Sequence, residues 1–281
     1  MVFINSKTKI RWKLKQWKLK TMGIKEELGL TLEISMPSGF TITIREQNGE
    51  DDDILSNMSN TGTTALHTFL AGIIIENDSI DKGKYTTPND IKKWKLKDKY
   101  YLTLKSRLHS LGNELEFNYI CKASTCSHKA EYEEDLSEYD QDLGQAIKKV
   151  GDMGYKPNAI TPYPNKLETH RTLELASKQI IKYKYLDGIG ENKVLDMPQN
   201  TLTKNAELIA RSIQLKLTDD KWQTIENFKL FTAREMREIR SDIKKNDAQF
   251  EMFTEIKCPK CGDIENTPLI SFQGFFFPED N

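Results

Sequence analysis

Hydrophobic and polar residues alternate with a period of two at several places in the chain, a pattern typical of strands with one buried face. In the first half the alternation covers LTLEIS (30–35) and FTITIRE (40–46), and the Pro and Gly of MPSG (36–39) predict a turn between them. ELEFNYIC (114–121) and HKAEYEEDL (128–136) alternate in the same way. We therefore expect two antiparallel hairpins in this half.

Helical spacing of apolar residues predicts the remaining elements of the first half. TTALHTFLAGIII (63–75) carries one apolar stripe, and a second helix begins at TTPND (86–90), where proline is tolerated in the first turn. A third helix covers 97–111 and ends before Gly112. The acidic run EDDD (50–53) is expected in a solvated loop.

In the second half, helical periodicity is predicted for 173–184 and 203–217, and GIGENK (188–193) is expected to form a turn. Thr232 and Glu235 have the spacing of a capping box, so a further helix begins there. These elements follow an order similar to that of the first half, which suggests an internal duplication.

The duplication is clearest at the cysteines, where QFEMFTEIKC (249–258) alternates as a strand and ENTPLISF (265–272) returns. We predict an α+β fold of two similar modules. Each has short antiparallel β-hairpins, two to three helices and a cysteine-tipped hairpin. The expected division is a basic N-terminal arm (1–22), a first module with C-x4-C (23–145) and a second module with C-x2-C (146–281).

The net charge of this 281-residue chain is only −1, but the charge is distributed unevenly. Seven basic residues and no acidic ones lie between Lys7 and Lys20, and KIRWKLK (9–15) alternates as an extended arm would. We expect the arm to bind a partner; the alternative is an edge strand whose lysines prevent aggregation. The predicted partner-binding residues of the arm are Arg11, Trp12, Lys13, Lys15, Trp17 and Lys18.

The candidate chemistry lies in four cysteines, which form a C-x4-C pair and a C-x2-C-G pair: Cys121, Cys126, Cys258 and Cys261. We recognise no secretory signal, so thiols or metal ligands are expected rather than disulfides. In each half the first cysteine ends an alternating strand. The spacing therefore predicts one structural zinc site of four thiolates, with no open position for water.

Other arrangements of the cysteines remain open. The first pair can pack as small buried hydrophobic residues while the second pair binds no metal. His128 can replace one cysteine, or CPKC (258–261) can pair with its copy in another subunit. We do not expect a thioredoxin-like redox role, because strands flank the motif instead of a strand and a helix.

The sequence contains no H-E-x-x-H, P-loop or G-x-S-x-G motif, and its four histidines show no ligand spacing. A closed zinc site stabilises a fold without activating water. We therefore expect a protein that is not an enzyme. No apolar run reaches the roughly 18 residues of a membrane span, so we expect no membrane partner.

Several of these features together resemble the T4-type baseplate hub assembly protein family of contractile-tailed bacteriophages. They are a strand pair around the PSG turn of LEISMPSGFTITIRE (32–46), and CPKCG (258–262) followed by PLISFQGFFFP (268–278). The residues of the helix that match the family's polar pattern are Asp98, Lys99, Leu102, Arg107, Ser110 and Gly112. The resemblance covers about residues 29–281, leaves the arm out and departs at C-x4-C, where the family has a tighter spacing.

The resemblance implies a non-enzymatic structural or assembly protein of the phage baseplate hub. Its partners would be other baseplate and tail proteins, and a homo-oligomer is left open. It would act in the host cytoplasm during assembly, and in the virion tail if it stays in the particle.

We expect Phe275, Phe276 and Phe277 to dock on these partners; the alternative is a last segment packed on its own core. The competing function is a zinc-ribbon nucleic-acid-binding accessory protein. That function predicts a basic face near the cysteines, whereas lysines and acidic residues are mixed there, so we do not expect nucleic acid as a partner.

Overall fold

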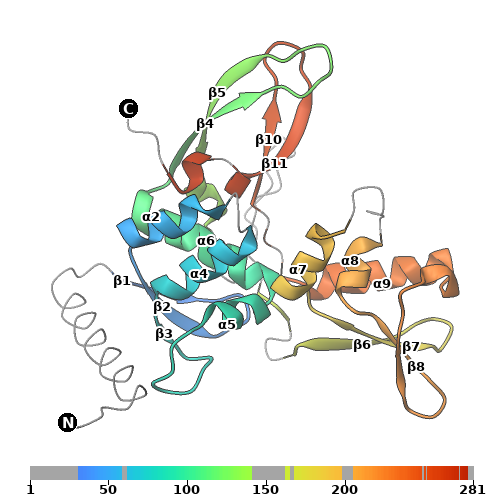
Figure 1. The fold of residues 1–281 in the computed structure, drawn as a ribbon. Helices are drawn as coiled ribbons and strands as arrows, with labels where there is room; N and C mark the ends of the chain where they lie inside the picture. Colours follow the sequence, from blue (N-terminus) through green and yellow to red (C-terminus); the bar gives the residue numbers. More distant parts are fainter. Residues whose placement is uncertain are drawn as a thin grey trace, which may run out of the picture.

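The computed structural model describes residues 31–58, 62–140, 162–164, 168–197, 205–248, 250, 252–271 and 273–277 (Figure 1). Within these ranges the chain forms seven α-helices and four small antiparallel sheets, which confirms the predicted α+β class. Among the helices described, none has the length and apolar character needed to cross a membrane.

The first sheet has the order β1-β2-β3 and is antiparallel throughout. Its strands are β1 (Thr31–Ser35), β2 (Thr41–Arg45) and β3 (Ile74–Asn77). The predicted turn between β1 and β2 is confirmed: Gly39 has a φ of 85° and its N–H donates to the Met36 carbonyl at 2.7 Å. The predicted helix over 63–75 ends two residues early, because the β-branched Ile74 and Ile75 join this sheet.

Four helices belong to this part of the chain: α2 (Gly49–Ser56), α4 (Thr63–Ile73), α5 (Pro88–Lys93) and α6 (Leu96–Leu111). The loop predicted at EDDD is wrong, because these residues form the first turns of α2. Asn48 caps the helix by accepting from the N–H groups of Glu50 and Asp51, and the Asp51 carboxylate accepts from the Asn48 N–H. Acidic side chains in a first turn also stabilise the helix dipole.

The second sheet has the order β6-β7-β8-β9. Its strands are β6 (His170–Glu174), β7 (Ile180–Lys184), β8 (Gln214–Lys216) and β9 (Trp222–Thr224). The helix predicted over 173–184 is wrong: Lys178 has a φ of 72°, and the chain turns there to pair β6 with β7. The helix predicted over 203–217 is likewise wrong for most of its length: Ala206–Ala210 are helical, but Gln214–Lys216 form a strand.

Three helices accompany the second sheet: α7 (Gly188–Leu195), α8 (Ala206–Ala210) and α9 (Ala233–Asn246). The turn predicted at GIGENK is wrong, because Asp187 caps α7 by accepting from the Gly190 N–H at 2.8 Å. The predicted start of α9 is confirmed, and Thr232 and Glu235 form the expected capping box.

Two short hairpins complete the fold and lie side by side at the top of Figure 1. The first is β4 (Glu114–Ile120) with β5 (Lys129–Asp135), and the second is β10 (Phe253–Lys257) with β11 (Ile264–Pro268). Both were expected from the sequence. In the second, β10 begins four residues later than predicted and β11 ends four residues earlier.

The described residues pack into two main hydrophobic cores. The first core joins residues of the first sheet, α4 and α6 with the C-terminal segment, which contributes Phe250, Met252, Ile256 and Phe275. The second core lies between the second sheet and α9. The C-terminal hairpin therefore packs with the N-terminal half of the chain, and the predicted boundary near residue 145 lies outside the described residues and stays a prediction.

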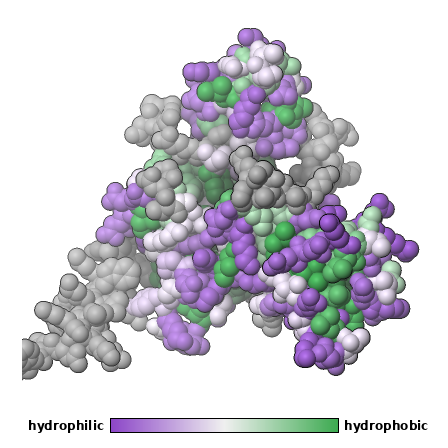
Figure 2. All heavy atoms as spheres, turned by 45° about the vertical axis from the view of Figure 1, so that its right-hand side comes forward, coloured by the Kyte–Doolittle hydropathy of each residue, from purple (hydrophilic) through white to green (hydrophobic). Residues whose placement is uncertain are grey.

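Figure 2 views the side that carries α7, α8, α9 and the second sheet. Hydrophilic residues cover most of the visible surface, and hydrophobic residues gather in one area at the lower right. Two large apolar side chains in this part of the sequence are mostly exposed: Leu195, the last residue of α7, is 65% exposed, and Leu230, just before α9, is 63% exposed.

Candidate metal centre

The inner faces of the two hairpins contact each other below the cysteines. Within the first hairpin, the rings of Tyr119 on β4 and Tyr132 on β5 meet edge to face with centroids 5.9 Å apart. From there the Tyr132 hydroxyl donates to the Lys257 carbonyl of the other hairpin at 3.1 Å. Thr254 donates to the Glu134 carboxylate, also at 3.1 Å. These contacts fix one hairpin against the other and bring their tips together.

Backbone geometry presents the cysteines at those tips. Cys121 follows β4 directly, and its N–H donates to the His128 carbonyl at 2.9 Å. Cys258 follows β10 in the same way, and its N–H donates to the Asp263 carbonyl at 2.8 Å. Gly262 has a φ of 75°, which lets the chain turn tightly after the second ligand of CPKC.

The structure brings together all four predicted ligands. The Sγ atoms of Cys121, Cys126, Cys258 and Cys261 lie within 4.8 Å of one another. The Sγ–Sγ distances are 3.6 Å from Cys121 to Cys261 and 3.7 Å from Cys126 to Cys258. Sulfurs at the corners of a tetrahedron around zinc, at about 2.3 Å from the metal, would be about 3.8 Å apart.

The cysteines are free thiols, and these distances are far from the roughly 2.05 Å of a disulfide. Cys121 and Cys258 are buried, Cys126 is half-buried and Cys261 is exposed, so a cation has access from the Cys261 side. The spacing and the donor set therefore fit a tetrahedral thiolate site. The identity of a bound metal remains a prediction.

The thiols differ in their proton affinity. The N–H of Cys261, and next that of Lys260, point at the Cys258 sulfur and lower its pKa to about 7. The N–H of Ala123 also lowers the pKa of Cys121, but burial and the neighbouring thiols outweigh it and raise that pKa to about 12. The Cys258 thiolate thus forms readily next to Cys121 and Cys261, whose pKa values are raised, and a divalent cation would displace their protons.

The geometry bears on two alternative ligand sets, one that includes His128 and one that is shared between two subunits. His128 is not part of the metal-ligand group found among the described residues. The two pairs of one chain already supply four donors, so a site between two subunits is not needed to complete the set.

Sequence analysis missed the polar residues beside the cluster. Glu265 of β11 accepts a hydrogen bond from the Tyr119 hydroxyl and forms an ion pair with Lys122. Each of these residues lies one to four positions from a cysteine; Lys122 and Glu265 belong to the mixed charges near the cysteines, and Tyr119 belongs to the alternating strand 114–121. They add a second bridge between the two hairpins.

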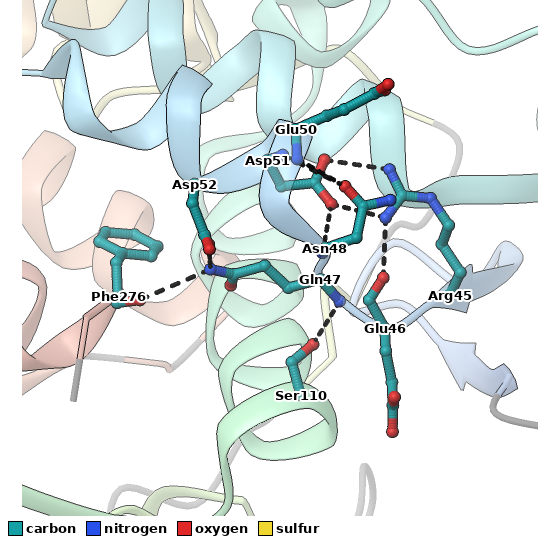
Figure 3. A network of polar contacts seen from close by, with 9 residues as sticks. All are labelled: Arg45, Glu46, Gln47, Asn48, Glu50, Asp51, Asp52, Ser110 and Phe276. Carbon is teal, nitrogen blue, oxygen red and sulfur yellow. Dashed lines mark hydrogen bonds and ion pairs between the residues drawn. The ribbon is translucent and has the colours of Figure 1, made fainter. Parts of the chain in front are cut away.

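A further link holds the C-terminal segment to the first core (Figure 3). The side-chain amide of Gln47 donates to the Phe276 carbonyl at 3.5 Å. The backbone N–H of Gln47 donates to the Ser110 hydroxyl at 2.8 Å. Phe275 and Phe276 are buried in the first core, and Phe277 packs against it. This is the packing alternative considered for these residues, and their role in docking stays a prediction.

The six predicted partner-binding residues of the N-terminal arm lie outside the described residues. Near the cysteines, Lys122 is paired with Glu265, and β5 exposes mainly carboxylates. In the described part of the chain this surface does not offer the basic face that nucleic-acid binding requires.

The family model for "T4 bacteriophage base plate protein" matches residues 5–277, which is nearly the whole chain. The match includes the basic arm, which the resemblance seen in the sequence had left out. Comparison with curated proteins and with solved structures gives no match.

Proposed function

The chain belongs to the T4 bacteriophage base plate protein family, and from this premise we propose that it serves as a non-enzymatic structural or assembly protein of the baseplate hub. It docks there on other tail proteins, first in the host cytoplasm during assembly and then in the virion tail. The family match over residues 5–277 is the observation that carries this proposal. The family description names the base plate, and the hub as the location within it is part of our proposal.

Zinc is the proposed cofactor, and Cys121, Cys126, Cys258 and Cys261 would hold it. The support is the donor set and the tetrahedral spacing of the sulfurs. Zinc bound by four protein thiolates supplies folding free energy and no coordination site for a reacting water. This accounts for a metal in a protein without catalytic activity.

The structural role of the metal follows from where its ligands lie in the chain. Two ligands belong to the β4–β5 hairpin and two to the β10–β11 hairpin, which are separated in sequence by the whole second sheet and α9. A bound metal would hold the C-terminal segment on the first core. A baseplate component needs such rigidity, because its surfaces must stay in register with several neighbours.

The test is co-expression of the chain with the other tail proteins of its phage, followed by purification through a tag on this chain. We expect at least one baseplate or tail protein to be retained through size-exclusion chromatography. Cys261→Ser should reduce that retention, whereas Lys260→Ala in the same turn should not. Retention of no tail protein by the wild-type chain would overturn the proposal.

A further inference from the structure

Within the part of the chain that the structure describes, no other element covers the outer face of the β4–β5 hairpin, and its charge pattern is unusual. Its side chains are all exposed and alternate with the packed ones along both strands. The residues of this outer face are Glu114, Glu116, Asn118, Ile120, Lys129, Glu131, Glu133 and Asp135.

Carboxylates lie directly opposite each other on this face. Glu114 pairs in register with Asp135, and Glu116 pairs with Glu133. Like charges in opposite positions of an antiparallel pair destabilise it. In the part of the chain that the structure describes, Glu131 and Glu133 have no ion-pair partner. Lys129 is the one basic residue among those that the structure describes on this face, and it lies opposite Ile120, so carboxylates outnumber cations there.

The chain itself supplies such cations. The N-terminal arm carries seven basic residues and no acidic ones between Lys7 and Lys20. Lys9, Arg11, Lys13 and Lys15 recur every two residues, as do Glu131, Glu133 and Asp135 on β5. An extended chain repeats every two residues at about 6.6–6.8 Å, so an extended arm would match the spacing of the carboxylates.

The arm also starts within reach of this face. Thr31, the first described residue, pairs with Arg45 across the first sheet. Two residues on, the Gln47 N–H donates to the Ser110 hydroxyl, just before β4 begins (Figure 3). These steps place Thr31 no more than roughly 30 Å from the base of the hairpin, and the ten residues 21–30 span up to about 33–36 Å.

We propose that the basic arm docks along the outer face of the β4–β5 hairpin of its own chain, with Lys9, Arg11, Lys13 and Lys15 against the carboxylates of Glu131, Glu133 and Asp135. A tether of this length gives the arm a millimolar effective concentration, which favours its own hairpin over that of a second copy. The inference rests on the opposite charges of the arm and the hairpin, on their common two-residue spacing and on the length of residues 21–30. It does not depend on the proposed function.

Carbodiimide cross-linking of the purified full-length chain tests the proposal, because the reagent joins a lysine amine to a carboxylate in contact with it. We expect peptides that link Lys9, Lys13 or Lys15 to Glu131 or Glu133. Their yield should fall about tenfold between low salt and 1 M salt, which screens exposed charges. Equal mixing with isotope-labelled chains should give links within one chain only.

Links between labelled and unlabelled chains would replace the proposed occupant with a second copy and so overturn the proposal. Links spread evenly over the acidic surface would also overturn it.

A second experiment exchanges the charges of the arm and the hairpin and measures the rate at which chymotrypsin cleaves the arm after Trp12 and Trp17. The double variant Glu131→Lys with Glu133→Lys should release the arm and speed cleavage about fivefold, and Lys13→Glu with Lys15→Glu should do the same. Combining the four substitutions should restore the slow rate. Glu255→Lys, on the exposed face of β10, is the matched control and should leave the cleavage rate unchanged.

Should the lysine variants misfold, Glu131→Gln with Glu133→Gln removes the charge at the same exposed positions. An unchanged cleavage rate in that variant would contradict the proposal.

Discussion

Cys121 and Cys261 are separated by 140 positions in the chain, yet their Sγ atoms lie 3.6 Å apart. This relationship ties the end of β4 to the turn after β10. It is the most direct structural sign that the two cysteine pairs act as one unit.

The first prediction concerns the metal. The purified wild-type chain should contain about one equivalent of zinc, and Cys258→Ser should contain less than half of that. Loss of the metal should lower the melting temperature by roughly 10 °C, since structural zinc contributes several kcal/mol to folding. Metal analysis and a thermal melt with and without chelator provide the measurement. Lys260→Ala, in the same turn, should keep both the metal and the melting temperature.

The second prediction concerns the ion pair that anchors α2 (Figure 3). Asp51 is 1% exposed and forms a two-point contact with the Arg45 guanidinium while it also caps the helix. Asp51→Asn should cost about 2–3 kcal/mol in the free energy of unfolding, because Arg45 would lose its charge partner. Asp53→Asn, two residues on and exposed, should stay within about 0.5 kcal/mol. Urea unfolding compares the two, and equal losses would contradict the assignment.

The third prediction compares two glycines that each begin a helix, Gly188 of α7 and Gly49 of α2. A Cβ on Gly188 would meet the Lys92 carbonyl oxygen at 2.9 Å and His67 Nε2 at 3.2 Å, whereas a Cβ on Gly49 would meet nothing within 4 Å. Gly188→Ala should therefore destabilise by about 1–3 kcal/mol through overpacking. Gly49→Ala should be neutral or stabilise slightly. A stable Gly188→Ala variant would show that α7 packs less closely on α4 and α5.

The fourth prediction is a pH dependence. Burial raises the pKa of Asp98 to about 6, although the Ser38 N–H and hydroxyl donate to its carboxylate and partly offset the effect. The unfolded value is about 3.9. The folded state thus binds the proton more tightly, so the contribution of Asp98 to stability is fully present below pH 4 and is lost as pH rises through 6. The loss amounts to about 3 kcal/mol.

Asp98→Asn removes this titration while an amide oxygen can still accept from Ser38. Relative to wild type, the variant should gain about 2 kcal/mol in the free energy of unfolding between pH 4.5 and pH 7. Denaturant unfolding at the two pH values measures the difference. Parallel pH profiles for the two proteins would exclude Asp98 as the titrating group.

Local signals allowed several elements to be predicted from the sequence. The capping box of Thr232 and Glu235 fixed the start of α9, since its chemistry depends only on residues three apart. The same signal at Asn48 and Asp51 marks the start of α2, whereas the charge of the acidic run taken alone predicts a solvated loop. Cysteine spacing predicted all four members of the metal-ligand group, because a turn with two closely spaced cysteines can present both sulfurs to one metal ion.

Contacts between distant residues explain what could not be predicted. LELASKQIIKYK fits both a helical and an alternating pattern, and the choice is made by the pairing of Ile181 with Leu215 of β8. Likewise, nothing local to Phe250 or Ile256 indicates that they pack in the first core instead of the second. Such choices depend on which surfaces are available after the rest of the chain has folded.

The way the first core is built has a consequence for biosynthesis. Residues for the second sheet and α9 leave the ribosome before the segment that carries Phe250, Ile256 and Cys258. At about 5–20 residues per second, Cys121 waits about 7–28 seconds for Cys261, 140 positions later. The nascent chain must keep the open side of its first core and two free thiols from aggregating or reacting during this interval, so the speed of translation bears on the yield of folded protein.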